Sequence, residues 1–258
     1  MPRLAIREDL LSGQTTMARF EHAVRLGTTA VELSADGLGE RIDEVVEAMA
    51  ATGVEIAAID HGRRDGILHI DPVERERALA ELRQSICDAA DLGASGVVFV
   101  PHFGALILPD LTPFLSAEAL AAELLLSHLR TLEDYAAAMG VSLFIRSLRQ
   151  QESAFLCRFE AAAAVARKRN HPSVRVAAGT LDLHSEGLDI PAALRAGAHM
   201  LGYLYISAVG LDVVDLAVLT AALEANGYNG WVTLESRAPH GEHDLSAAVA
   251  SLRASGFA

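Results

Sequence analysis

Eight short apolar segments of strand type alternate with helical segments, and this alternation constrains the fold more than any other feature of the sequence. The expected strands span residues 3–7, 29–34, 54–60, 96–102, 141–147, 174–179, 201–208 and 231–236. Helices are expected between them, and the clearest two, 71–93 and 116–140, end in glycine, which commonly follows a last helical turn. This alternation favours parallel strands joined by right-handed crossovers.

Eight strand–helix units in 258 residues predict an α/β fold, a closed (β/α)8 TIM barrel formed as a single domain over residues 1–258. Hydrophobic residues make up 51% of the chain, which supplies enough apolar surface for a large core. The alternative architecture is an open doubly wound sheet. Such a sheet usually carries a Gly-rich phosphate turn after its first strand, and "LAIREDLLSGQ" (4–14) contains none.

The charge and the cysteine content limit the partners and the compartment that we expect. The formal net charge of −13 disfavours nucleic-acid binding, because an acidic surface repels phosphate backbones. Cys87 and Cys157 have no metal-type spacing around them and fit a reducing compartment. The N-terminus does not resemble a signal peptide, and no uncharged apolar stretch reaches the roughly 20 residues of a membrane helix. We therefore expect a cytoplasmic protein that binds a small-molecule substrate or ligand, and neither nucleic acid nor membrane.

One expected strand ends on a charged residue, in the segment "VSLFIRSLRQQES" (141–153). The apolar run from Val141 to Ile145 stops at Arg146, and arginine is rarely buried in proteins unless it is paired. In TIM barrels, the active site is built from the C-terminal ends of the strands and from the loops that follow them. We therefore expect Arg146 to face the active-site end of the barrel and to pair with a carboxylate there.

Three longer segments resemble the sugar isomerase/epimerase superfamily, the xylose isomerase-like barrels. They are "LGTTAVELSADGL" (26–38), "DPVERERALAELRQSICDAADLGASGVVFVP" (71–101) and "GYNGWVTLES" (227–236). The resemblance spans nearly the whole chain and implies the same barrel fold. Barrels of this superfamily often pair, so it also implies a homodimer. The resemblance says less about activity, because function resides in the site rather than in the fold.

The resemblance also implies a metal site, but this sequence departs from it. Members usually hold one divalent cation with a Glu, an Asp, a His and a second Glu at the ends of strands five to eight, and the two Glu side chains move protons. The aligned residues here are Arg146, Gly179, Tyr205 and Glu235, while a further Glu of the strand-five motif is kept as Glu152. A guanidinium group repels a cation, so we expect no metal and no other cofactor.

The loss of those ligands suggests a partner for Arg146 and leaves fewer side chains that could carry out catalysis. We expect the guanidinium group to bind Glu235 as a planar fork, partly replacing the ion. Because Arg146 cannot act as a base, proton transfer of isomerase or lyase type would rely on one carboxylate and an acid. The candidate catalytic residues are Glu235, Arg146, Tyr205 and Asp182. The candidate substrate-binding residues are Glu152, His61, His102, His184, Arg149 and Arg237.

The sequence leaves other readings open. The chain could be a non-catalytic relative that only binds a small polyol, sugar or oxo-acid. It could instead be a metal-dependent isomerase with rearranged ligands drawn from Glu235, Asp182, His184 and His61. Individual residues also have structural explanations: Glu152 could cap a helix, Tyr205 could fill the barrel, and the histidines could be structural hydrogen-bonders.

Overall fold

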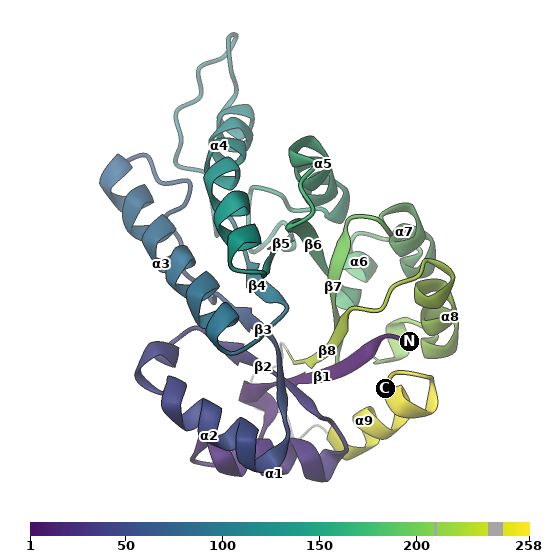
Figure 1. Ribbon diagram of the computed structural model, residues 1–258. Coiled ribbons are helices and arrows are strands. Elements are labelled where there is room, and N and C mark those ends of the chain that lie inside the picture. The colour runs from purple at the N-terminus through teal and green to yellow at the C-terminus, as the bar shows by residue number, and fades with distance from the viewer. Residues whose placement is uncertain (209–210, 237–244) are drawn as a thin grey trace.

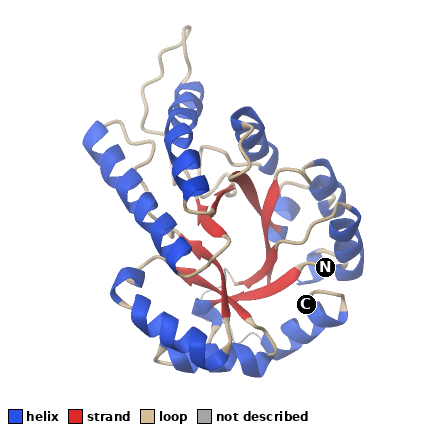
Figure 2. Cartoon of the chain, viewed as in Figure 1, coloured by secondary structure: helices blue, strands red, loops and turns tan. Residues whose placement is uncertain are grey.

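The computed structural model describes residues 1–208, 211–236 and 245–258, and within them the chain forms a closed barrel of parallel strands surrounded by helices (Figures 1 and 2). The strands pair in sequence order from β1 to β8, and β8 closes the barrel against β1. Their bounds are β1 (Arg3–Arg7), β2 (Ala30–Ser34), β3 (Glu55–Asp60), β4 (Gly96–Phe99), β5 (Ser142–Arg146), β6 (Val174–Gly179), β7 (Leu201–Ser207) and β8 (Trp231–Glu235). The predicted (β/α)8 TIM barrel is confirmed.

Helices cover the outside of the barrel, and their bounds agree with the sequence signals. The α-helices are α1 (Thr16–Leu26), α2 (Ile42–Thr52), α3 (Pro72–Asp91), α4 (Ala117–Ala138), α5 (Phe159–Arg169), α6 (Thr180–Ser185), α7 (Ile190–Ala196), α8 (Leu216–Ala225) and α9 (Leu245–Ala254). Short 3-10 turns are η1 (Glu8–Leu10), η2 (Leu38–Glu40) and η3 (Leu211–Val213). Asp71 caps α3 and Ser116 caps α4, each accepting a hydrogen bond from a first-turn backbone N–H.

The predicted strand at residues 96–102 is longer than the observed one. β4 ends at Phe99, three residues earlier than expected. Pro101 has no N–H to donate to a neighbouring strand, so the ladder cannot continue through it. His102 therefore lies in the connection to α4 rather than at the end of a strand. The other strand limits agree with the prediction to within a residue.

The strands separate two buried layers, because successive side chains of a strand point to opposite faces. Outward side chains pack with the helices in the larger apolar core. A second, separate buried cluster contains small residues and aromatic rings: Ala5, Ala30, Ala57, Ala58, Val98, Phe144, Ala177, Tyr203, Tyr205 and Trp231. The small residues leave space inside the barrel, and charged side chains at the C-terminal strand ends are buried above this cluster.

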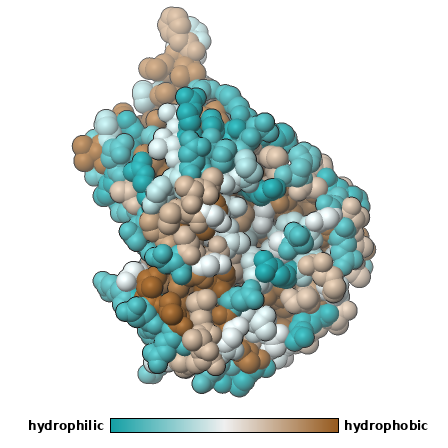
Figure 3. Space-filling model, in the orientation of Figure 1, coloured by the Kyte–Doolittle hydropathy of each residue, from teal (hydrophilic) through white to brown (hydrophobic). Residues whose placement is uncertain are grey.

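The most prominent feature of the surface is the connection between β4 and α4. It extends beyond the barrel (Figure 1), and its apolar tip stands out in Figure 3. Phe114 in this connection is 93% exposed. In the described part of the chain, every helix is too short or too polar to cross a membrane.

Candidate active site

Arg146 and Glu235 form a buried ion pair at the C-terminal end of the barrel. Arg146 is the last residue of β5 and Glu235 is the last residue of β8, and both side chains are less than a tenth exposed. The Arg146 Nη2 group donates to Oε1 and Oε2 of Glu235, at 2.8 and 3.0 Å. The pairing expected from the sequence is therefore present. The contact is made by one nitrogen that bridges both oxygens, rather than by the two prongs of the guanidinium fork.

Two further predicted residues, Tyr205 and Asp182, contact the Arg146 side chain. The guanidinium carbon lies 3.9 Å from the centre of the Tyr205 ring, and Nη2 lies 3.6 Å from Oδ2 of Asp182. Burial by itself lowers the pKa of Arg146, but Glu235, Tyr205 and Asp182 more than reverse this, so its pKa lies above the usual value. Arg146 is thus held permanently as a cation.

A second charged cluster, which the sequence did not predict, gathers the partly exposed Arg7 and Asp60, at the ends of β1 and β3, around the buried Glu32 of β2. Arg7 Nη1 donates to Oδ2 of Asp60 at 2.9 Å and lies 3.7 Å from Oε1 of Glu32. Neither carboxylate oxygen of Glu32 has a hydrogen-bond partner among the described residues. Burial raises the pKa of Glu32 to about 8, against the opposing charge of Arg7. A carboxylate inside the apolar segment "AVELS" (30–34) was the sequence signal for this cluster.

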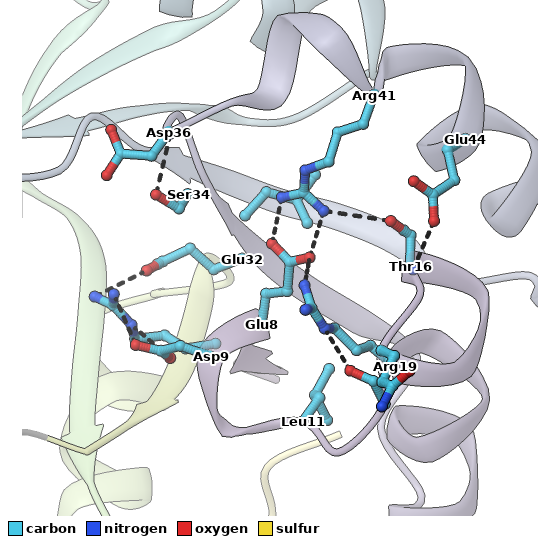
Figure 4. Close-up of a pocket in the computed structure, with 14 residues that line it drawn as sticks. Glu8, Asp9, Leu11, Thr16, Arg19, Glu32, Ser34, Asp36, Arg41 and Glu44 are labelled. Atoms are coloured by element: carbon cyan, nitrogen blue, oxygen red, sulfur yellow. Dashed lines mark hydrogen bonds and ion pairs between the residues drawn. The ribbon is translucent and has the colours of Figure 1, made fainter. Parts of the chain in front are cut away.

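Both clusters border cavities at the barrel mouth. One cavity of about 500 Å³ is lined by members of both clusters, Arg7, Asp60, Arg146 and Glu235, and by the charged residues Asp36, Arg63, Arg149 and Glu152. A neighbouring cavity of about 650 Å³ shares Arg7, Ser34 and Asp36 with it and is shown in Figure 4. In that view Glu8 receives hydrogen bonds from Arg19 and Arg41, which tie η1 to the first turn of α1 and to the N-cap of α2. The mouth is therefore wide, polar and of mixed charge.

Arg149 and Glu152, two predicted substrate-binding residues, reach the cavity together. Arg149 Nε donates to Oε2 of Glu152 at 3.1 Å and lies 3.9 Å from Oδ1 of Asp182. Glu152 does not cap a helix, because α5 begins only at Phe159. These contacts link the loop after β5 to the ion pair through Asp182.

His61 and His102 do not line the two cavities. The Nδ1 atom of His61 lies 2.9 Å from Oγ of Ser85 on α3, and burial lowers the pKa of His61 to about 4, so its ring is neutral. His102 Nε2 lies 2.9 Å from the carbonyl oxygen of Ala105. A hydrogen bond with Asp65 raises the pKa of His102. Both histidines are buried and make contacts that organise the connections after β3 and β4.

The last two predicted binding residues cannot be placed in the mouth. His184 lies on α6 and is exposed to solvent. Arg237 lies outside the described residues, as do His240 and His243 of the "HGEHD" segment.

The residues at the four family ligand positions do not fit a divalent cation. Of these positions only Glu235 carries a carboxylate, and the Arg146 guanidinium lies 2.8 Å from it. At Gly179 a Cβ atom would come 2.6 Å from Oδ2 of Asp182, so that carboxylate fills the space beside the glycine. Tyr205 is fully buried beneath Arg146, and burial raises its pKa well above the usual value. Within the described residues, no group of three or more His, Cys, Asp or Glu side chains is arranged to hold a metal.

Comparison with known proteins agrees with this geometry at the level of the fold. The structure is similar to 3-keto-D-glucoside 4-epimerase from E. coli, with a TM-score of 0.87 and 20% identity over 98% of this chain and 100% of that one. It is also similar to D-psicose 3-epimerase from Clostridium cellulolyticum H10, with a TM-score of 0.80 and 18% identity over 96% and 89% of the two chains. An L-ribulose 3-epimerase gives a TM-score of 0.77 and 21% identity over 98% and 93%.

Sequence comparison gives the family. A search of curated proteins finds no match. Residues 20–255 match the family described as xylose isomerase-like TIM barrel, and this match covers most of the chain. The chain therefore belongs to the xylose isomerase-like TIM barrels.

Proposed function

We propose that this protein is a metal-independent enzyme of the sugar isomerase/epimerase type, acting on a small polyol, sugar or oxo-acid at the C-terminal mouth of the barrel. The observation that carries the proposal is the ion pair of Arg146 and Glu235, which lines the mouth cavity where the family places its metal. A guanidinium group that stays charged supplies the positive charge that a cation would otherwise supply.

In this proposal Glu235 is the base. Its carboxylate lines the cavity and takes a proton from a carbon next to a carbonyl group. Arg146 stabilises the negative charge that develops on the carbonyl oxygen, or binds a substrate carboxylate. Tyr205 and Asp182 do not line the cavity, so they act by positioning Arg146 rather than by touching substrate.

A second candidate function, ligand binding without catalysis, is favoured by one detail of the pair. Both oxygens of Glu235 lie within 3.0 Å of Arg146 Nη2, so the carboxylate is already engaged before a ligand enters. A carboxylate stabilised in this way by a guanidinium group is a weaker base.

Proton exchange with solvent tests the proposal whichever product the reaction forms. Purified protein treated with EDTA is incubated in D2O with a panel of sugars, polyols and keto acids, and loss of C–H signal is followed by NMR. We expect exchange with at least one compound, and a decrease of about 100-fold or more in Glu235→Gln. The matched control is Glu55→Gln, whose exposed carboxylate at the start of β3 lies away from the mouth and should leave the rate unchanged.

Three outcomes would contradict the proposal. Full exchange in Glu235→Gln would show that Glu235 is not the base. Exchange that appears only after Mn²⁺ or Co²⁺ is added would show that the reaction needs a metal. Saturable binding of a compound without any exchange would support the ligand-binding alternative.

A further inference from the structure

A third cavity, of about 750 Å³, lies at the opposite, N-terminal end of the barrel. Its walls come from the beginnings of strands: Arg3 opens β1, Ser142 opens β5, Trp231 opens β8, and Arg175 is the second residue of β6. Parallel strands gather their N-terminal ends at one end of a barrel, away from the mouth. None of the described residues that line this cavity also lines either mouth cavity.

The charge of this N-terminal cavity is opposite to that of the whole chain. Its described lining residues include Arg3, Arg175 and His199, and none of them is an Asp or a Glu. Both mouth cavities, in contrast, carry carboxylates beside their arginines. A purely basic concavity on a chain of net charge −13 concentrates positive potential where a small anion fits.

Within the described part of the chain, the two arginines of the cavity make few hydrogen bonds. Arg3 is stacked with its guanidinium carbon 3.8 Å from the centre of the Trp231 ring, and its contact with Glu55 is a loose 3.7 Å pair between half-exposed side chains. Arg175 donates through Nη1 to the carbonyl oxygen of His199 at 3.0 Å. Among the described residues these contacts use only part of the N–H donors of Arg3 and Arg175, which leaves donors for a ligand oxygen.

We propose that the N-terminal cavity binds a small polyanion, a phosphorylated or polycarboxylate metabolite, through Arg3 and Arg175. Guanidinium groups match the planar spacing of carboxylate and phosphate oxygens. This site is independent of the proposed enzyme activity at the mouth.

The chain carries its own reporter for this site, because Trp231 is its single tryptophan and it lies under Arg3. The experiment follows tryptophan fluorescence while pyrophosphate, citrate or glucose is added at constant ionic strength. We expect a saturable change with pyrophosphate, citrate or both, and none with neutral glucose. Comparing the apparent Kd values of pyrophosphate and citrate shows whether the site prefers phosphate or carboxylate oxygens.

Variants assign the signal to the cavity. In Arg175→Gln we expect the apparent Kd to rise roughly tenfold or more, and in Arg175→Lys, which keeps the charge, to rise less. Two controls should bind as the parent does: Arg77→Gln on the exposed face of α3, and Arg149→Gln at the mouth. If Arg175→Gln does not fold, Arg3→Gln is tested by thermal shift, and we expect it to lose the stabilisation that pyrophosphate gives the parent.

The proposal is overturned if neither anion produces a saturable change in the parent protein. It is also overturned if Arg175→Gln binds as tightly as the parent, or if Arg149→Gln weakens binding more than Arg175→Gln does, since the anion would then occupy the mouth.

Discussion

Arg146 and Glu235 bury opposite charges inside an apolar barrel, and each makes the other tolerable there. Removing one partner leaves an uncompensated buried charge, which costs far more than the pair itself contributes. We expect Arg146→Met to lower the free energy of unfolding by about 3–5 kcal/mol, measured by urea denaturation. Arg146→Met combined with Glu235→Leu should recover part of that loss, because Glu235 no longer leaves an unpaired charge, while the buried Asp182 keeps, among the described residues, only the more distant Arg149 as a cation.

The matched control for this pair is an ion pair at the surface. Lys168 and Glu123 are 2.8 Å apart and both mostly exposed, so Lys168→Met should change stability little. Equal losses in Lys168→Met and Arg146→Met would show that burial does not set the energy of the Arg146 pair.

Glu32 is expected to make the stability of the protein depend on pH. Burial raises its pKa from 4.5 to about 8 in the folded state, with Arg7 opposing the shift and Asp60 adding to it. Between these two values the folded state binds more protons than the unfolded state. Stability therefore falls as pH rises through this window, by up to about 1.4 kcal/mol per pH unit for a group that titrates fully.

Glu32→Gln tests this dependence, because its amide does not titrate. We expect urea unfolding at about pH 6 and about pH 8.5 to show a large loss of stability in the parent and a much smaller loss in Glu32→Gln. Glu160→Gln, which alters an exposed carboxylate on α5, should keep the parent's slope. An unchanged slope in Glu32→Gln would mean that Glu32 is ionised in the folded protein across this range.

At the scale of elements, the pairing of β4 with β5 depends on a glycine. Gly96 is paired with Ser142, and a Cβ atom at Gly96 would collide with the carbonyl oxygen of Ser142 and lie 2.8 Å from the Phe144 ring. We expect Gly96→Ala to force the strands apart and to lower the free energy of unfolding by about 1–3 kcal/mol or more.

Thermal unfolding of Gly96→Ala and Gly39→Ala checks this expectation. A Cβ atom at Gly39 meets nothing within 4 Å, so that substitution should leave the midpoint almost unchanged. The close approach of the two strands would be in doubt if both variants had the same midpoint.

Most elements could be predicted from the sequence because their signals are local. Apolar runs set the strands, and caps such as Asp71 and Ser116 set the beginnings of the helices. β4 ended early because Pro101 interrupts the ladder, a local signal that the apolar run outweighed in the prediction.

At the scale of the whole molecule, the two chain ends complete the barrel. β1 pairs with β8, and the backbone of Ala258 bonds to that of Pro2 and Leu4, so the ends lie together (Figure 1). Phe257 is 2% exposed and belongs to the main apolar core. We expect Phe257→Ala to cost about 3–5 kcal/mol of unfolding free energy, measured by urea denaturation.

Phe114→Ala is the matched control, because that ring is 93% exposed at the tip of the β4–α4 connection. It should leave stability within experimental error of the parent. A small effect of Phe257→Ala would indicate that the core closes without the last residues of the chain.

The sequence by itself determined the barrel, the order of its elements and the placing of Arg146 and Glu235 at one end of it. These follow from local periodicity and from the rule that parallel strands present their C-terminal ends together. Only the tertiary structure decided that Glu32 lies buried beside Arg7, that Asp182 and Tyr205 stand behind Arg146, and that His61 points away from the mouth. These depend on the direction and burial of side chains from strands far apart in the sequence, which no local pattern records.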